Sequence, residues 1–139
     1  MQTRQIDLVQ QSFAQVRPIA DQAAALFYGR LFELDPSLRP LFRGDLKAQG
    51  QMLMSMIAGA VSGLRDLPRL SPVLRSLGAR HVGYGVQDGH YATVGSALLW
   101  TLEQGLGDAF TPDVREAWTA AYGLLAGTMQ AGAHEAVPA

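Results

Sequence analysis

With 139 residues, 48% of them hydrophobic and 17% charged, the chain has the length and balance of one globular domain with a substantial core. Its net charge of -1 and pI of about 6.3 leave no basic surface, which argues against nucleic acid or an anionic membrane as a partner. Cysteine is absent, and this excludes disulfide bonds, iron–sulfur clusters and thiolate catalysis.

Hydrophobic residues recur along the chain at spacings of three and four, and prolines mark the breaks between the segments. We expect Thr3 to cap the first helix, and Pro18 and Pro36 to begin new ones. The predicted helices cover residues 6–17, 18–33, 36–42, 46–64, 71–80, 88–105 and 112–132. No segment alternates as a strand does, so the fold is predicted to be all-α, with about seven unequal helices.

The domain limits and the cellular location are predicted from features that the sequence lacks. It shows no repeat and no linker, so we expect a single domain over residues 1–139, with residues 133–139 as a flexible tail. Residues 1–7 lack the apolar run of a signal peptide, and the apolar stretch 52–61 is too short to span a bilayer. A cytoplasmic protein with no membrane partner is predicted.

Glycines interrupt two of the predicted helices. Gly59 and Gly63 lie inside the pattern of residues 46–64, where each costs about 1 kcal/mol relative to alanine. They suggest close approach by another helix or by a flat ligand. Farther along, Gly83 and Gly85 form a corner directly after His81.

The three histidines are the candidate metal ligands. His81 follows Leu77 by one turn, so the Leu77 carbonyl is well placed to accept a hydrogen bond from its ring. A packed histidine remains the commoner outcome at such a position. His90 begins a helix, where capping is the simpler interpretation, and His134 falls in the expected tail, exposed to solvent. No partner stands at zinc or di-iron spacing, whereas a lone histidine among Leu, Met, Phe and Tyr suits haem.

Three motifs stand at consistent distances: Leu26-Phe27-Tyr28-x2-Leu31-Phe32-x3-Pro36-x2-Arg39-Pro40-Leu41-Phe42, His81-x8-His90-Tyr91, and Ala117-Trp118-x3-Tyr122-Gly123. With them the chain resembles a bacterial single-domain globin of the flavohaemoglobin-type and neuroglobin-like group, from about residue 6 to residue 129. The resemblance implies a globin fold around a pocket for haem b.

It also implies a role for each matching residue. His81 is similar to the proximal iron ligand, and Tyr28 and Gln49 are similar to distal groups that donate hydrogen bonds to a bound gas, beside a wall formed by Leu53. Cofactor contacts are implied for Phe42, Leu53, Arg80, Val86, Tyr91 and Val94, with Lys47 as a second candidate for the propionates. Without the resemblance, Tyr28 and Phe42 would be interpreted as core residues, and the polar residues as solvated ones.

The chain departs from the flavohaemoglobin pattern at one position. Tyr91 matches the tyrosine that pairs with the proximal histidine, but Ala133 stands where those proteins have a glutamate, and Glu135 is two residues away. A carboxylate there would make the imidazole a stronger electron donor. Its absence puts peroxidase-like and dedicated dioxygenase chemistry in doubt.

Three functions remain open. The first is reversible binding of O2, and of NO and CO, at a pentacoordinate iron with high O2 affinity, as a carrier, store or scavenger. The second is a nitric oxide dioxygenase, with Tyr28 and Gln49 acting on the gas and an external reductase supplying electrons. The third is a haem-based gas sensor or a haem-free interaction domain. Either a monomer or a homodimer is compatible with the sequence.

Overall fold

The computed structural model describes residues 1–42 and 44–136, and every regular element in that part of the chain is helical. The α-helices are α1 (Thr3–Val16), α2 (Ala20–Leu34), α3 (Leu46–Ser62), α4 (Leu67–Gly83), α5 (Asp88–Leu106) and α6 (Pro112–Ala136). Short 3-10 helices join them: η1 (Arg17–Ile19), η2 (Pro36–Leu41), η3 (Gly63–Arg65) and η4 (Gly107–Ala109). The all-α prediction is confirmed, and six α-helices together with η2 correspond to the seven expected segments.

Three expected boundaries differ from the structure. The first helix begins at Thr3 itself and is capped by Gln2, whose backbone N–H donates to Gln5 Oε1 at 3.1 Å. The helix expected over residues 71–80 spans Leu67–Gly83 and keeps Pro72 in its interior, flanked by buried Leu70 and Leu74. Pro72 forgoes one backbone hydrogen bond, a cost that the packing of these leucines offsets.

The third boundary is at the C-terminal end. Helix α6 continues through Ala133 to Ala136, and Ala133 is buried, so a flexible tail does not begin at residue 133. Residues 137–139 lie outside the described part of the chain. The helix extends this far because its last turns pack on α4.

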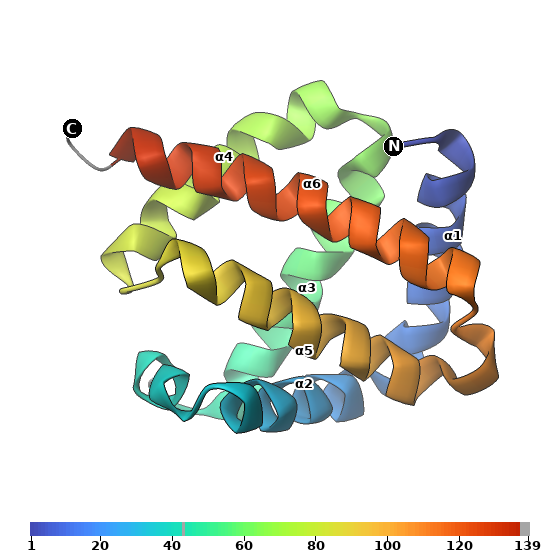
Figure 1. Ribbon diagram of the computed structural model, residues 1–139, viewed down its shortest axis with the longest axis horizontal. Coiled ribbons are helices and arrows are strands. Elements are labelled where there is room, and N and C mark those ends of the chain that lie inside the picture. The colour runs from blue at the N-terminus through green and yellow to red at the C-terminus, as the bar shows by residue number, and fades with distance from the viewer. Residues whose placement is uncertain (43, 137–139) are drawn as a thin grey trace.

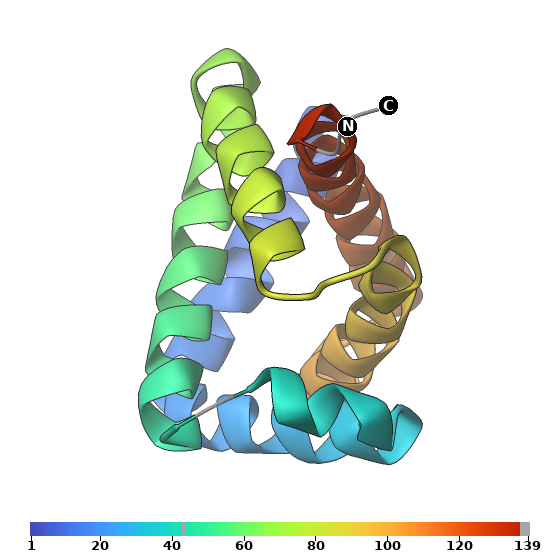
Figure 2. The same cartoon turned by 90° about the vertical axis from the view of Figure 1, so that its left-hand side faces the viewer.

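The helices pack as two sets. Helix α6 lies against α4 and α1, while α2 lies against α5 and α3 (Figure 1). Turned by 90°, α3 forms one wall and the α5–α6 pair the other, with α2 and η2 closing the base and the end of α4 between the walls (Figure 2). None of the described helices has the length and apolar character needed to cross a membrane.

Two hydrophobic clusters fill the interior. The Trp118 cluster joins α1, α2, α3, η3, α5 and α6, and its largest buried side chain, Trp118, donates its indole N–H to Ser12 Oγ at 2.8 Å. Its buried members are Val9, Phe13, Val16, Ala23, Val61, Leu64, Leu102, Val114, Ala117, Trp118 and Ala121. The Tyr28 cluster lies toward η2. Its buried members are Phe27, Tyr28, Leu31, Leu38 and Ala97, with Phe32, Leu41, Phe42, Leu53, Val94 and Leu98 packed against them.

Glycines permit the closest helix crossings. A Cβ on Gly78 would lie 1.9 Å from the Met129 carbonyl oxygen, and one on Gly132 would lie 2.1 Å from that of Arg75. Backbones of α4 and α6 therefore touch at two points, which only glycine allows.

Of the two glycines expected to permit a close approach, Gly63 meets Leu70 of α4, because a Cβ there would lie 3.1 Å from Leu70 Cδ1. No helix approaches Gly59, where a Cβ would meet nothing within 4 Å, and the tightest contact on α3 is at Gly50.

Candidate functional site

His81 lies in the last turn of α4, where its ring is half-buried. Its Nδ1 is 2.8 Å from the Leu77 carbonyl oxygen, which is the predicted hydrogen bond. Because a carbonyl can only accept, Nδ1 carries the proton and Nε2 keeps its lone pair. The backbone of α4 thus orients the ring and selects the tautomer that can bind a metal through Nε2.

The charge state of His81 also favours binding of a metal ion. Burial lowers the pKa of its imidazole, the hydrogen bond to Leu77 acts in the opposite direction, and the positive charge of Arg80 lowers the pKa further. The ring is therefore neutral at pH 7, as a metal-binding imidazole must be.

The corner after His81 turns sharply and lies against η2. Backbone N–H groups of Tyr84 and Val86 donate to the His81 carbonyl at 3.0 and 3.1 Å, and Gly85 adopts a φ of +89°. This left-handed conformation favours glycine and ends the helix as the sequence predicted. A Cβ on Gly85 would lie 3.3 Å from Leu41 Cδ2, so the corner approaches the Tyr28 cluster.

Tyr28 is buried on α2 within a set of aromatic rings. Ring centroids of Phe27, Phe32 and Phe42 lie 5.4, 6.0 and 5.2 Å from that of Tyr28. The structure therefore brings together four of the predicted site residues, which are Tyr28, Phe42, Leu53 and Val94. Phe27 and Phe32 belong to the motif over residues 26–42 but were not predicted as site residues.

The Tyr28 hydroxyl is an unused hydrogen-bond donor. Burial raises the pKa of its phenol, so the group stays protonated at neutral pH. Among the described residues, none forms a hydrogen bond with this hydroxyl, in contrast to the Tyr122 hydroxyl, which donates to the Tyr91 carbonyl at 2.6 Å.

Helix α3 carries the second predicted distal residue. Asp45 caps the helix, its carboxylate accepting from the Lys47 N–H at 2.9 Å and its carbonyl from the Gln49 N–H at 3.1 Å. Gln49 is half-buried one turn before Leu53, on the same face of α3. Lys47 and Arg80 are both exposed, so either side chain can pair with an anionic group at the protein surface.

The hydrogen bonding of Tyr91 differs from the prediction. Its side chain is buried, but its hydroxyl has no hydrogen-bond partner among the described residues, so the expected pairing with His81 is absent. Burial, followed by the negative charge of Asp88, raises the pKa of this phenol. Leaving a buried hydroxyl unpaired costs about 1–3 kcal/mol of folding free energy. A bound cofactor that accepted this hydrogen bond would remove that cost.

The remaining candidates hold the helix ends together. His90 Nδ1 accepts from the Gln87 N–H at 3.0 Å, the capping role that was the simpler interpretation. His134 is exposed but not merely solvated, because its Nε2 lies 2.7 Å from Asp88 Oδ2. Glu135 forms an ion pair with Arg75. The C-terminal acid is thus engaged with α4 through Arg75.

Comparison with known proteins decides the family, since residues 25–129 match the family model named Globin. The chain belongs to the globin family. It is 36% identical over 121 residues to the neuroglobins of Chaenocephalus aceratus and Dissostichus mawsoni, an alignment that covers 77% of this chain and 76% of each relative. It is 29% identical over 129 residues to the flavohemoprotein of Bacillus subtilis (strain 168), covering 91% of this chain but 32% of that protein. The chain therefore spans about a third of the length of the flavohemoprotein.

Globins are haem proteins that bind small gases such as O2, and the residues of this globin fit that cofactor. In the described residues there is no group of three or more His, Cys, Asp or Glu side chains that could enclose a metal ion. One neutral imidazole with a free Nε2 needs a porphyrin to supply the other ligands, and the orphaned Tyr91 hydroxyl fits the same pocket.

Proposed function

We propose that this globin reversibly binds O2, and also NO and CO, at a haem b iron held by His81, with Tyr28 and Gln49 donating hydrogen bonds to the gas on the other side. The observation that carries the proposal is the Tyr28 hydroxyl, which is protonated, held in a cage of phenylalanines and unused by the described residues. Tyr28 is only 6% exposed, and its O–H is available to donate to a bound gas.

Several side chains would hold the cofactor. Haem would supply an iron that can bind a diatomic gas, and these side chains would hold that cofactor. His81 presents Nε2 to the metal while Leu77 holds the ring in place. Phe42, Leu53, Val86 and Val94 offer the apolar surface for the flat macrocycle, and exposed Arg80 is suited to a propionate at the rim.

The distal residues favour O2 over less polar gases. Phe32 and Phe42 restrict the Tyr28 ring, so its hydroxyl gives up little freedom when it donates. The aromatic side chains around it keep bulk water away, and a low local dielectric strengthens the bond. A net gain of about 1 kcal/mol per hydrogen bond slows O2 release roughly fivefold.

The test compares gas release from the haem-loaded protein and its Tyr28→Phe variant by stopped flow. We expect faster O2 release, by roughly fivefold to tenfold, with CO release nearly unchanged because bound CO is less polar. Tyr122→Phe is the matched control, since it removes a partly buried hydroxyl that donates to the Tyr91 carbonyl. Equal changes for both gases would mean that Tyr28 acts through its shape alone.

A nitric oxide dioxygenase remains the alternative, and it would use the same distal residues with an external reductase. The C-terminal end of α6 does not favour it. Ala133 has no carboxylate, and Glu135 is paired with Arg75, so the acid that would strengthen His81 as an electron donor is engaged elsewhere. Reversible binding is therefore the better supported function.

A further inference from the structure

A groove on the surface between α1 and α3 lies apart from the proposed haem site. Its volume is about 350 Å³, at the small end of the range for small-molecule sites. Four of its lining residues belong to α1 and η1, and four belong to α3 and η3. None of them is in the Tyr28 cluster or among the predicted haem contacts. An occupant of this groove would therefore be a molecule other than haem or its gas.

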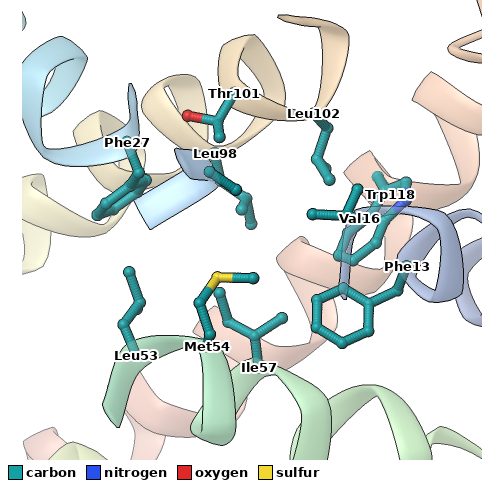
Figure 3. Close-up of a pocket in the computed structure, with 11 residues that line it drawn as sticks. Phe13, Val16, Phe27, Leu53, Met54, Ile57, Leu98, Thr101, Leu102 and Trp118 are labelled. Carbon is teal, nitrogen blue, oxygen red and sulfur yellow. The ribbon is translucent and has the colours of Figure 1, made fainter. Parts of the chain in front are cut away.

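The floor of the groove is apolar and is held by the core. Ala14, Ala58 and Val61 line it, together with Phe13, which is only 5% exposed. The Phe13 ring packs on Trp118, with ring centroids 6.2 Å apart, and also lines an apolar cavity inside the core (Figure 3). Because this packing fixes the ring, the floor is a preformed apolar surface, and a ligand that covers it costs the protein little freedom.

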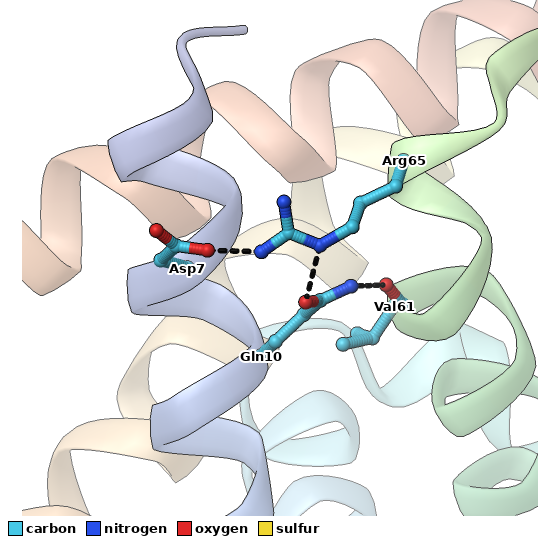
Figure 4. A network of polar contacts seen from close by, with 4 residues as sticks. All are labelled: Asp7, Gln10, Val61 and Arg65. Carbon is cyan, nitrogen blue, oxygen red and sulfur yellow. Dashed lines mark hydrogen bonds and ion pairs between the residues drawn. The ribbon is translucent and has the colours of Figure 1, made fainter.

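At one end of the groove, Arg65 is engaged with neighbouring side chains. Its Nε donates to Gln10 Oε1 at 3.1 Å, and its guanidinium forms an ion pair with Asp7 (Figure 4). Gln10 Nε2 in turn donates to the Val61 carbonyl at 3.0 Å. This network ties α1 to the end of α3, and Asp7 balances the charge of Arg65. The network therefore shapes this end of the groove without adding net charge to it.

The other end of the groove carries a cation without a partner. Arg17 is exposed and follows Gln10 by about two helical turns. Among the described residues, none forms a hydrogen bond or an ion pair with its side chain. No described residue that lines the groove is acidic, and Arg65 is already balanced. One uncompensated positive charge remains, and it favours an occupant with one negative charge.

We propose that the groove binds a small aromatic monocarboxylate, whose ring covers the Phe13 floor and whose carboxylate pairs with Arg17. The planar guanidinium can bind both oxygens of a carboxylate. A second negative charge would meet no free cation among the lining residues, so phosphates and dicarboxylates match the groove less well. An exposed ion pair contributes little by itself, so the ring must supply much of the affinity. The proposal does not depend on the gas site.

Binding is tested with phenylacetate on the CO-bound haem protein, followed by NMR of backbone amides and methyl groups. We expect saturable shifts at Ala14 and Ala58 in the groove and none at Val94 in the Tyr28 cluster. Acetate has the charge without the ring and should give no saturable shifts. Phenethyl alcohol has the ring without the charge and should bind roughly fivefold more weakly than phenylacetate. Shifts confined to Val94, or no saturable shifts with phenylacetate, would overturn the site.

The contribution of the charge is tested by substitution at Arg17. We expect Arg17→Gln to weaken phenylacetate binding roughly fivefold and to leave phenethyl alcohol binding unchanged. Arg69→Gln is the matched control, because Arg69 is an exposed guanidinium outside the groove. Equal weakening by the two variants would show only a general attraction to positive charge and would overturn the pairing with Arg17.

The position of the ring is tested by filling the groove. Ala14 is exposed and lines the groove, whereas its neighbour Gln15 is exposed and does not. We expect Ala14→Trp to abolish phenylacetate binding and Gln15→Trp to leave it unchanged, with both variants folded because neither position is buried. Undiminished binding in Ala14→Trp would place the ligand elsewhere and overturn the groove as its site.

Discussion

The Trp118 cluster and the Tyr28 region, which is the Tyr28 cluster together with His81 and Tyr91, share helices but differ in whether their polar groups are paired. Around Trp118, each buried polar side chain is paired: the indole with Ser12, and Thr101 with the Ala97 carbonyl. At the other end, the Tyr28 and Tyr91 hydroxyls lack partners among the described residues, and His81 bonds through one ring nitrogen only. Paired groups stabilise the fold, whereas unpaired ones are available to a ligand, so the comparison supports the site proposed for the Tyr28 region.

The largest effect is expected from His81→Ala, which removes the ligand atom from the Tyr28 region and leaves the Trp118 cluster untouched. We expect loss of stable haem binding, followed by Soret absorbance after gel filtration, with helix content by circular dichroism unchanged. His90→Ala is the control, because His90 only caps α5. A variant that kept the wild-type spectrum would show that His81 is not the iron ligand.

Gly78→Ala tests the close crossing between α4, which carries His81, and α6, which carries Trp118. The added Cβ would lie 1.9 Å from the Met129 carbonyl, a backbone atom that cannot turn aside, so α4 must separate from α6. We expect a loss of about 3 kcal/mol in the free energy of unfolding, at the upper end of overpacking costs. Urea titration measures it, with Gly83→Ala as the control on the same helix, since a Cβ there meets nothing within 4 Å. Similar values for both variants would contradict the close crossing.

The comparison also explains which features the sequence was able to predict. Helices α2, α3 and α5 agree with their predicted limits to within two residues, and the bond from His81 to Leu77 was expected, because spacing, caps and one-turn contacts are local properties. Helix α4 was predicted to begin only at residue 71, because local rules take its prolines as breaks and do not include the packing of Leu70 and Leu74. The contact of Gly78 with Met129 joins residues far apart in the chain, and its only local signal is a glycine inside a helix.

A smaller effect on stability is expected from deleting one hydroxyl beside Trp118 and, separately, one in the Tyr28 region. Ser12→Ala leaves the Trp118 N–H buried without an acceptor, and we expect a loss of about 2 kcal/mol in the free energy of unfolding of the cofactor-free protein. Tyr91→Phe removes a hydroxyl that has no partner, so stability should stay within about 1 kcal/mol of the wild type or rise. Equal losses for the two variants in urea titrations would mean that the Tyr91 hydroxyl is already satisfied.

The smallest effect concerns pH and again belongs to the Tyr28 region. Burial lowers the pKa of His81 below its ordinary value of 6.5, so the unfolded chain takes up a proton at higher pH than the folded one. The contribution to stability is therefore complete above about pH 6.5 and is lost as the pH falls through the lower, folded-state pKa. Urea titrations of the cofactor-free protein at pH 7.5 and 5.5 should show a stability loss in acid that is smaller in His81→Leu, which cannot titrate. If the wild type and His81→Leu lost equal stability in acid, the sensitivity would come from other groups. The lowered pKa of His81, and with it the neutral imidazole needed to bind iron, would then be contradicted.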